Sequence, residues 1–259
     1  MNREDLVSII TPSYNTGEYI EETIDSVLNQ TYDNWEMIIV DDCSTDNTDD
    51  IVAQYDDDRI IYVKNEKNSG AAVSRNRALR MAKGKWIAFL DSDDVWLPEK
   101  LEKQINFMEE NDYHFTGTYY SEINEKSESI GKVNTGPSYV PKYGMYAYCW
   151  PGCLTVIYDH ELVGLIQIAD IKKRNDYAIW LDVTTKSNFY MLDEVLAKYR
   201  RREGSISNTS LKKLLKSQYD MYRISDGKSV VKSSLFTLTN CVFGVIKKKI
   251  YCKKDEKNV

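Results

Sequence analysis

The sequence lacks the residue patterns that bind zinc or build a disulfide framework. It has two histidines and five cysteines in 259 residues. Cys149 and Cys153 have neither a second cysteine pair nor a histidine nearby, whereas a structural zinc site needs four such ligands at characteristic spacing. The cysteine usage therefore indicates a protein of a reducing compartment without structural zinc.

Two targeting features are also missing from the sequence. Residues 1–5 lead directly into a strand-like run, so we expect no signal peptide. We also find no apolar stretch that reaches the roughly 20 residues needed to span a bilayer. These absences predict a cytoplasmic protein that meets a membrane, if at all, at its cytoplasmic face.

Glycine-rich phosphate-binding loops are absent too. Neither G-x-G-x-x-G nor G-x-x-x-x-G-K-[ST] follows a strand-like run. A ligand that carries phosphates would therefore need a metal ion and side chains to offset its charge.

The charge of the chain is unevenly distributed. The net charge of −6 argues against a general nucleic-acid binder, but residues 212–259 hold twelve Lys or Arg and four Asp or Glu and so carry +8. A basic tail on an acidic body predicts an anionic partner, and an anionic membrane surface is the partner we expect.

Apolar runs alternate with amphipathic segments through the first 118 residues. Strand-like runs lie at 6–10, 37–40, 60–63 and 86–90. Helical patterns follow after Gly17, around 51–55, at 71–83 and from Pro98, which suits the first position of a helix. The alternation predicts an α/β fold with a doubly wound, mainly parallel sheet flanked by helices.

Polar side chains follow three of these strands, where such sheets bind ligands. They are Tyr14-Asn15, Asp41-Asp42 and Asp91-Ser92-Asp93-Asp94. Carboxylates this close together need a positive partner, and Mg²⁺ or Mn²⁺ bound by one or two carboxylates plus substrate phosphates meets that need. For the last run, the alternative is an acidic turn that caps the next helix.

Together these segments resemble the family-2 glycosyltransferases of GT-A fold. The resemblance covers about residues 6–205 and rests on Val7 to Asn15, Ile39 to Asp46, Gly70 to Asn76 and Leu90 to Asp94. It implies an inverting enzyme that moves a sugar from a nucleotide-diphosphate donor, such as a UDP-sugar, to an acceptor hydroxyl. It also implies a role in bacterial surface polysaccharide biosynthesis, with a saccharide acceptor that is carried on a lipid.

On the donor side, the resemblance places Tyr14 against the base, with Pro12 and Asn15 beside it. Asp42, with Asp41 next to it, would read the base and the ribose. For Tyr14 the alternative is an ordinary loop residue.

The diphosphate end of the donor is assigned in the same way. Asp93 is the expected direct ligand of Mn²⁺ or Mg²⁺, and Asp91 and Ser92 complete the D-x-D motif. Asp94 would serve the following helix or support the site. Arg75 and Arg202 would bind near the diphosphate. The alternative for Arg75 is a residue on a helix surface, and the alternative for Arg202 is a residue of a solvated loop.

On the acceptor side, the resemblance covers the segment from Tyr143 to Tyr158. Cys153 and Thr155 are candidates to line the sugar pocket, and burial without function is the alternative. The family has an acidic pair before an aromatic-rich helix, and here the first member is Asn175, so Asp176 is the expected general base. Trp180 would then wall the site one helical turn further on. An N-cap role is the alternative for Asp176.

We divide the chain into a glycosyltransferase domain at 1–210 and a basic, amphipathic helical extension at 211–259. The nucleotide-binding part of the domain is about 1–118 and the acceptor-binding part about 119–210. Apolar residues from Leu235 to Ile246 predict an interfacial helix on an anionic membrane. Packing on the protein itself, or a homodimer contact, is the alternative.

Two other function classes are alternatives to a transferase. A sugar-nucleotide pyrophosphorylase usually has a glycine-rich basic loop after its first strand, which Thr11 to Asn15 does not provide. A non-catalytic nucleotide-sugar-binding paralogue or scaffold is favoured slightly by Asn175. The presence of Asp176 and of the donor-side acids speaks against it.

Overall fold

The computed structural model describes residues 5–202 and 211–254. The first half runs through β1 (Val7–Ser13), α1 (Ile20–Leu28), β2 (Trp35–Asp41), α2 (Thr48–Val52), β3 (Ile60–Lys64), α3 (Ala71–Met81), β4 (Trp86–Phe89), β5 (Val95–Trp96) and α4 (Lys100–Asn111). The second half continues with β6 (Phe115–Ile123), β7 (Ser129–Asn134), β8 (Tyr139–Val140), the 3₁₀ turns η1 (Gly144–Tyr146) and η2 (Cys153–Thr155), β9 (Ile157–Asp159), α5 (His160–Val163), α6 (Asn175–Val183) and β10 (Phe189–Arg200). The chain then forms α7 (Leu211–Asp220), the π-helical turn η3 (Met221–Ser225), α8 (Val230–Ile250) and β11 (Cys252–Lys254).

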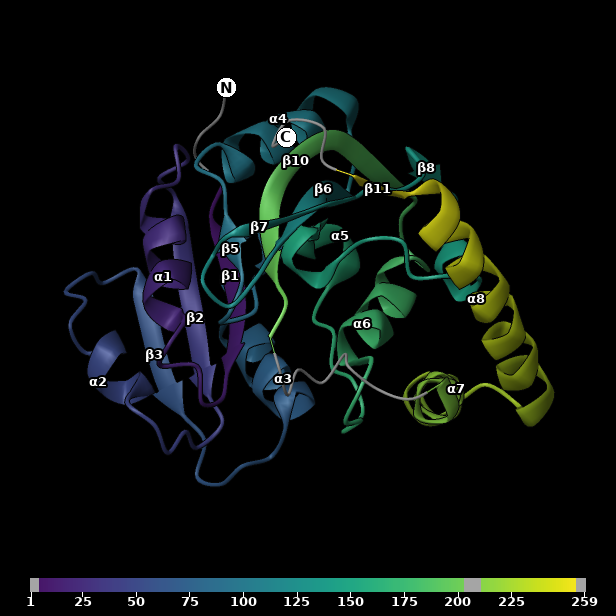
Figure 1. Cartoon of the computed structure of the whole chain (residues 1–259), viewed down its shortest axis with the longest axis horizontal. Helices are drawn as coiled ribbons and strands as arrows, with labels where there is room; N and C mark the ends of the chain where they lie inside the picture. Colours follow the sequence, from purple (N-terminus) through teal and green to yellow (C-terminus); the bar gives the residue numbers. More distant parts are fainter. Residues whose placement is uncertain (1–4, 203–210, 255–259) are drawn as a thin grey trace.

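The strands form one mixed sheet in the order β11-β7-β6-β9-β4-β1-β2-β3 (Figure 1). β1 lies between β2 and β4, and β1 to β4 are parallel, as the sequence predicts. The second half differs, because β9 is antiparallel to both β4 and β6, and β7 is antiparallel to β6. The long strand β10 pairs in parallel with β6 and also reaches β5 and β8.

Helices cover both faces of the parallel part of the sheet. Alternate side chains of one strand enter two separate cores, because successive residues of a strand point to opposite faces. In β2, for example, Ile38 and Val40 join one core, and Met37 and Ile39 join the other. The first core packs against α3 and α6, and the second packs against α1, α2 and α4. The predicted α/β architecture of the first half is confirmed.

Two boundaries differ from the sequence prediction. β1 continues through Thr11 and Pro12 to Ser13, because these residues pair in register with β2 up to Asp41. Pro98 lies before the helix and not at its first position, since α4 begins at Lys100. The carbonyl of Pro98 instead accepts a hydrogen bond from the backbone N–H of Thr31 at 2.9 Å.

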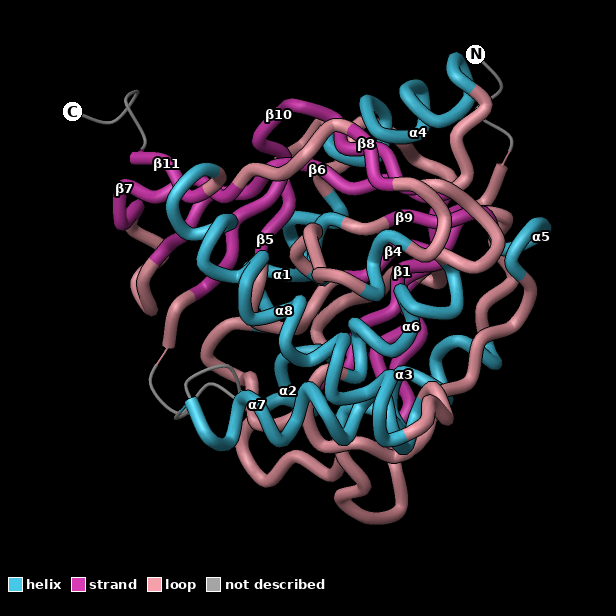
Figure 2. The backbone as a smooth tube through the Cα atoms, turned by 90° about the vertical axis from the view of Figure 1, so that its right-hand side faces the viewer, coloured by secondary structure: helices cyan, strands magenta, loops and turns pink. Residues whose placement is uncertain are grey.

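The C-terminal helix corrects the expectation that no apolar stretch is long enough to span a bilayer. α8 is one continuous helix of 21 residues with a mean hydropathy of 1.2, which suffices by length and composition. Polar residues such as Ser234 and Asn240 interrupt the apolar run in the sequence but not the helix. α8 lies at the right-hand edge of the molecule in Figure 1 and next to α7 in Figure 2, and β11 then returns to pair with β7.

Candidate active site

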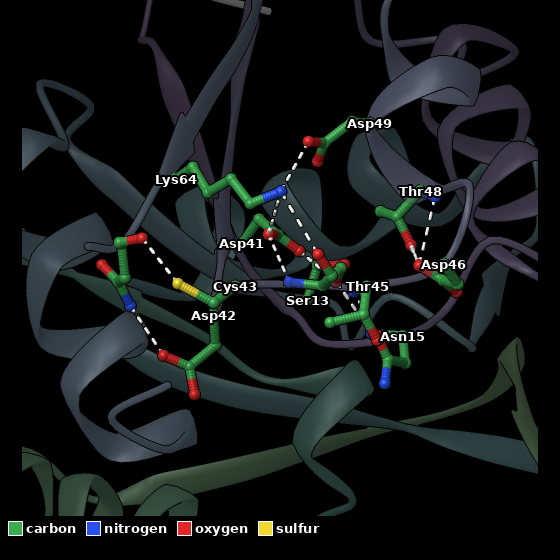
Figure 3. A network of polar contacts seen from close by, with 12 residues as sticks. Ser13, Asn15, Asp41, Asp42, Cys43, Thr45, Asp46, Thr48, Asp49 and Lys64 are labelled. Atoms are coloured by element: carbon green, nitrogen blue, oxygen red, sulfur yellow. Dashed lines mark hydrogen bonds and ion pairs between the residues drawn. The ribbon is translucent and has the colours of Figure 1, made fainter. Parts of the chain in front are cut away.

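The loops after β1 and β2 meet at the carboxyl edge of the sheet, as predicted (Figure 3). The backbone N–H of Asn15 donates to Ser44 Oγ at 2.8 Å, and Asn15 Oδ1 accepts from the backbone N–H of Thr45 at 2.8 Å. Asn15 has a φ of 49°, a left-handed conformation that asparagine tolerates better than most residues. Tyr14 stands beside this contact with 47% of its surface exposed, so its ring is available to a ligand.

The two aspartates after β2 organise the loops around them. Asp42 Oδ1 accepts from Asn65 Nδ2 at 2.9 Å and from the backbone N–H of Ser69 at 2.8 Å, while Oδ2 accepts from Gly70 N–H at 2.6 Å. Through these bonds Asp42 holds the segment that leads into α3.

Asp41, the last residue of β2, is fully buried. Its carboxylate accepts from the backbone N–H of Ser44 at 2.8 Å and from the Ser44 hydroxyl, and lies 3.8 Å from Lys64 Nζ. The structure therefore gives Asp41 the role of shaping the loop and not that of a surface which a donor could touch. Two further candidates, Pro12 and Ser92, are buried as well.

Arg75 does not lie on a helix surface, which was its alternative, and its contact with the donor stays a prediction. Its guanidinium is buried and donates to Asp91 Oδ1 and to Asn175 Oδ1, and its Nη2 lies 3.8 Å from Cys153 Sγ. One side chain thus joins the loop after β4 to the start of α6. Asn175, the residue that departs from the family's acidic pair, is the uncharged acceptor of this arginine.

In the same cluster, the charges of Asp91 in the predicted metal motif and of Asp176, the predicted base, act on the same two side chains, Arg75 and Cys153. Burial acts to lower the pKa of Arg75, but the neighbouring carboxylates, Asp91 first and also Asp176, outweigh burial and raise that pKa on balance. Burial, with the nearby carboxylates of Asp91 and Asp176, raises the pKa of the Cys153 thiol well above its ordinary value. Cys153 is therefore a neutral thiol at the junction of the two sides of the site.

The second aspartate of the D-x-D motif pairs with the predicted diphosphate-binding arginine. Asp93 Oδ2 lies 2.6 Å from Arg202 Nε. Burial raises the pKa of Asp93 and Asp91 adds to the increase, while Arg202 opposes it. The carboxylate thus needs a positive partner, which the guanidinium supplies in this structure.

The carboxylates of Asp93 and Asp91 suit a divalent metal ion, and the phosphates of the nucleotide sugar would complete its coordination. Within residues 5–202 and 211–254, no three His, Cys, Asp or Glu side chains gather as a metal site. Mg²⁺ and Mn²⁺ are commonly held by one or two carboxylates plus substrate phosphates. Asp93 and Asp91 would hold the ion here.

Asp94 supports this loop, which is one of its two expected roles, and Arg200 supports it too but was not found by sequence reasoning. Asp94 Oδ1 accepts from the backbone N–H of Arg200 at 2.8 Å, so Asp94 is tied to β10 and not to the following helix. The buried guanidinium of Arg200 donates to the carbonyl of Asp93 at 2.8 Å and also pairs with Glu22. The signal was the spacing of Arg200 and Arg202, which lie on the same side of an extended segment.

On the acceptor side, Asp176 lies in the first turn of α6, partly exposed, while Arg174 occupies the N-cap position. The alternative N-cap role is thus excluded. Trp180 does not wall the site, because its ring is fully buried in the core against Phe89 and Phe115. Thr155 is also fully buried and donates to the carbonyl of Gly152 at 2.8 Å.

Comparison with known proteins is consistent with this arrangement. Residues 8–160 match the sequence profile of the family described as "Glycosyl transferase family 2". TuaG of Bacillus subtilis, named a putative teichuronic acid biosynthesis glycosyltransferase, is 46% identical over 225 residues, which are 86% of this chain and 89% of TuaG. WfgD of Escherichia coli is 39% identical over 254 residues, 97% of this chain and 98% of WfgD. Its name is UDP-Glc:alpha-D-GlcNAc-diphosphoundecaprenol beta-1,3-glucosyltransferase.

Two solved structures share the fold. Staphylococcus aureus TarS 1–349, in complex with UDP-GlcNAc, has a TM-score of 0.67 at 23% identity and covers 89% of this chain and 70% of its own. The mannosyltransferase PcManGT from Pyrobaculum calidifontis, in complex with GDP-Man and Mn²⁺, has a TM-score of 0.64 at 17% identity, with coverage of 90% and 68%. The family match and the two relatives together show that this chain belongs to glycosyl transferase family 2 and is a glycosyltransferase.

Proposed function

We propose that the chain transfers a sugar from a UDP-sugar to a lipid-linked saccharide with inversion at the anomeric carbon, in the biosynthesis of a bacterial surface polysaccharide. The observation that carries the proposal is the buried bridge from Asp91 through Arg75 to Asn175. This bridge joins the loop of the proposed donor-side carboxylates to the start of α6, where Asp176 follows Asn175. The names of WfgD and TuaG support the substrate class and the pathway.

In this proposal, the donor lies along the carboxyl edge of the sheet. Tyr14 stacks on the base, and Asp42 helps to read the base and ribose while it holds residues 65–70 in place. Mn²⁺ or Mg²⁺ on Asp93 and Asp91 would offset the charge that develops on the leaving diphosphate. Arg202, which pairs with Asp93, binds the diphosphate with its planar fork of N–H groups.

Asp176 is the proposed general base. It takes the proton from the acceptor hydroxyl as the oxygen attacks the anomeric carbon and the nucleoside diphosphate leaves from the opposite face. This single displacement inverts the configuration, so an α-linked donor gives a β-linked product. A positioned base contributes about 10²- to 10⁴-fold to such a step.

The test is turnover of the full chain with UDP-glucose, Mn²⁺ and an N-acetylglucosamine diphospholipid, with the product's anomeric configuration read by NMR. We expect a β-linked disaccharide. An α-linked product would overturn inversion. Transfer only from sugars on another nucleotide would overturn the UDP assignment.

Donor binding is tested separately by calorimetry with UDP and Mn²⁺. Asp93→Ala should abolish the metal-dependent part of the binding. Asp58→Ala removes an exposed carboxylate near the other end of β3 and should bind as the unaltered chain does. Equal metal-dependent binding by both variants would refute the assignment of Asp93.

A further inference from the structure

One face of α8 carries a continuous row of exposed apolar side chains. Their exposed fractions run from 54% to 77% at Val231, Leu235, Leu238, Val242 and Val245. The intervals of four, three, four and three residues place all five on one line along the helix. Monomeric soluble proteins rarely expose apolar rows of this extent without a partner, so this row, the outer face of α8, requires one.

The opposite face of α8 is bound to the protein. Asn240 Nδ2 donates to Tyr177 Oη at 3.1 Å, and Lys247 Nζ donates to the carbonyl of Trp150 at 2.6 Å. Phe236 and Phe243 pack against the core beside them. These contacts fix the helix against the body of the protein, so α8 is placed to lie along a surface and not to cross a bilayer.

An apolar groove extends the outer face towards α7. Its volume is about 420 Å³, and its lining includes Leu215 and Tyr219 of α7 with Leu238 and Cys241 of α8. In Figure 2 the two helices lie next to each other. The apolar surface is thus broader than a single row and belongs to a helix pair.

The charges around this surface indicate which kind of partner binds it. α8 has exposed lysines at Lys232, Lys248 and Lys249 and contains no Asp or Glu, while the neighbouring α7 carries Lys212, Lys213 and Lys216. A second copy that packed through the same face would bring lysines together without acids on α8 to pair them. Anionic lipid headgroups offer the opposite charge, and acyl chains accept the apolar row.

We infer that the outer face of α8, with the groove beside α7, docks this protein on an anionic membrane surface, with α8 in the plane of the interface. Figure 1 shows α8 at the opposite edge of the molecule from α2 and β3, so the nucleotide-binding strands face away from the docked edge.

The docked helix is also tied to the acceptor side of the site. The hydroxyl of Tyr177, the residue after Asp176, lies 3.1 Å from both Tyr222 Oη and Asn240 Nδ2 in a buried cluster. α8 therefore holds α6 at a set distance from the membrane. This consequence, unlike docking itself, rests on the proposed function, because it presents Asp176 to an acceptor that is anchored in the same membrane.

Vesicle flotation of the full chain, without donor or acceptor, tests the docking. Vesicles of phosphatidylcholine with phosphatidylglycerol should carry the protein, and vesicles of phosphatidylcholine alone should carry about tenfold less, since each interfacial Lys gains from anionic lipid. Leu235→Glu with Val242→Glu should lose at least about tenfold of the flotation on the anionic vesicles. Leu162→Glu with Leu165→Glu, on and after α5, adds the same charge at exposed apolar positions and should float like the unaltered chain.

Three results would overturn the inference. They are absence of flotation by the unaltered chain, equal flotation by the Leu235→Glu/Val242→Glu variant, and a dimer in analytical ultracentrifugation that this variant abolishes while vesicles bind neither form. Calorimetric UDP binding by the same samples shows that the variant is folded. It also separates a failure of docking from a failure of the proposed donor chemistry.

Discussion

Asp176 and Asp182 are carboxylates on the same helix, α6. Only Asp176 lies in its first turn, where its charge contributes to raising the pKa values of Arg75 and Cys153. We predict that Asp176→Asn lowers kcat by about 10²- to 10⁴-fold, because the amide cannot take the acceptor proton. Donor binding should not change, since the proposed donor contacts lie on other loops. Initial rates and UDP calorimetry measure the two effects.

Asp182→Asn is the matched control for that change. Asp182 is exposed, six residues along α6 and towards its C-terminal end. Its substitution should leave the rate within about twofold, as expected for a surface change. Full activity in the Asp176→Asn variant would remove Asp176 from the role of base.

Arg75 contributes to stability through its two partners. Arg75→Ala leaves the buried Asn175 and the partly exposed Asp91 without their common donor, and a buried acceptor left without its partner costs about 1–3 kcal/mol. Urea unfolding should show this loss in the free energy of unfolding. Arg80→Ala, at an exposed position of the same helix, should change it by less than about 0.5 kcal/mol. Equal stability of the two variants would contradict the bridge.

The buried Lys100 should make the free energy of unfolding depend on pH. It is fully buried with its Nζ 3.9 Å from the centroid of the Trp96 ring, and burial lowers its pKa well below the ordinary value of 10.5. Between these two pKa values the unfolded chain binds more protons than the folded chain, so this residue makes stability rise with pH across that window.

Lys100→Met should therefore raise Tm at neutral pH and flatten the dependence of Tm on pH above it. Each kcal/mol gained corresponds to about 2–4 °C in a protein of this size. Lys103→Met removes a partly exposed lysine that pairs with Glu99 and Glu194 and should keep the slope of the unaltered chain. An unchanged slope in Lys100→Met would show that Lys100 does not titrate as described.

At the residue scale, sequence reasoning found side chains whose neighbours lie close in the chain. Tyr14 and Asp93 follow the ends of β1 and β4, and Asp176 lies in the first turn of α6, so their positions in the fold are as expected while their roles stay predictions. The contact between Arg75 and Asn175 spans 100 residues, and no local pattern predicts such a pair. Trp180 was assigned by helical spacing alone, which does not tell a pocket wall from a core residue.

At the element scale, the connection between α3 and β4 shows why the sheet needs a glycine. The backbone N–H groups of Lys83 and Gly84 donate to Ser8 Oγ at 3.1 and 2.8 Å, and Ser8 Oγ donates to Glu36 at 2.6 Å. A Cβ on Gly84 would lie 2.5 Å from the carbonyl oxygen of Leu6. β1, β2 and β4 therefore meet around a position that has no room for a side chain.

Gly84→Ala should destabilise the fold by about 1–3 kcal/mol, because rigid backbone of β1 must move to admit the methyl group. Gly136→Ala is the control, since its added Cβ would meet only the flexible end of Met191 at 2.6 Å. We expect that variant to lose less than about 1 kcal/mol. Urea unfolding of both compares them, and equal losses would contradict the tight packing at Gly84.

Elements built from strong local patterns were predictable, and those set by distant pairing were not. The first four strands were identified by apolar runs and the loops that end them. β9 and β11 have three residues each and exist because β4, β6 and β7 offer them partners. The full length of α8 was missed because polar residues that face the protein, such as Asn240, look like interruptions in the sequence.

At the scale of the whole molecule, α8, which carries the proposed docking surface, is held against α6, which carries Asp176. A membrane-bound enzyme meets a membrane-bound acceptor at a high effective concentration. Leu235→Glu with Val242→Glu should therefore lower kcat/KM for a lipid-linked acceptor in anionic vesicles by about tenfold or more. A water-soluble analogue of the same saccharide should react at an unchanged rate, because the substituted side chains are outside the site.

Comparing the rate loss with the lipid-linked acceptor and the rate loss with the water-soluble acceptor identifies the role of α8. If both reactions slow equally, the substitutions act through Asn240 and Tyr177 on the geometry of Asp176, and the helix supports the site without docking it. If only the vesicle reaction slows, and Leu162→Glu with Leu165→Glu leaves both unchanged, then the loss comes from the membrane. The lysines make the second result the expected one, because about 1 kcal/mol for each interfacial Lys is available only where anionic lipid is present.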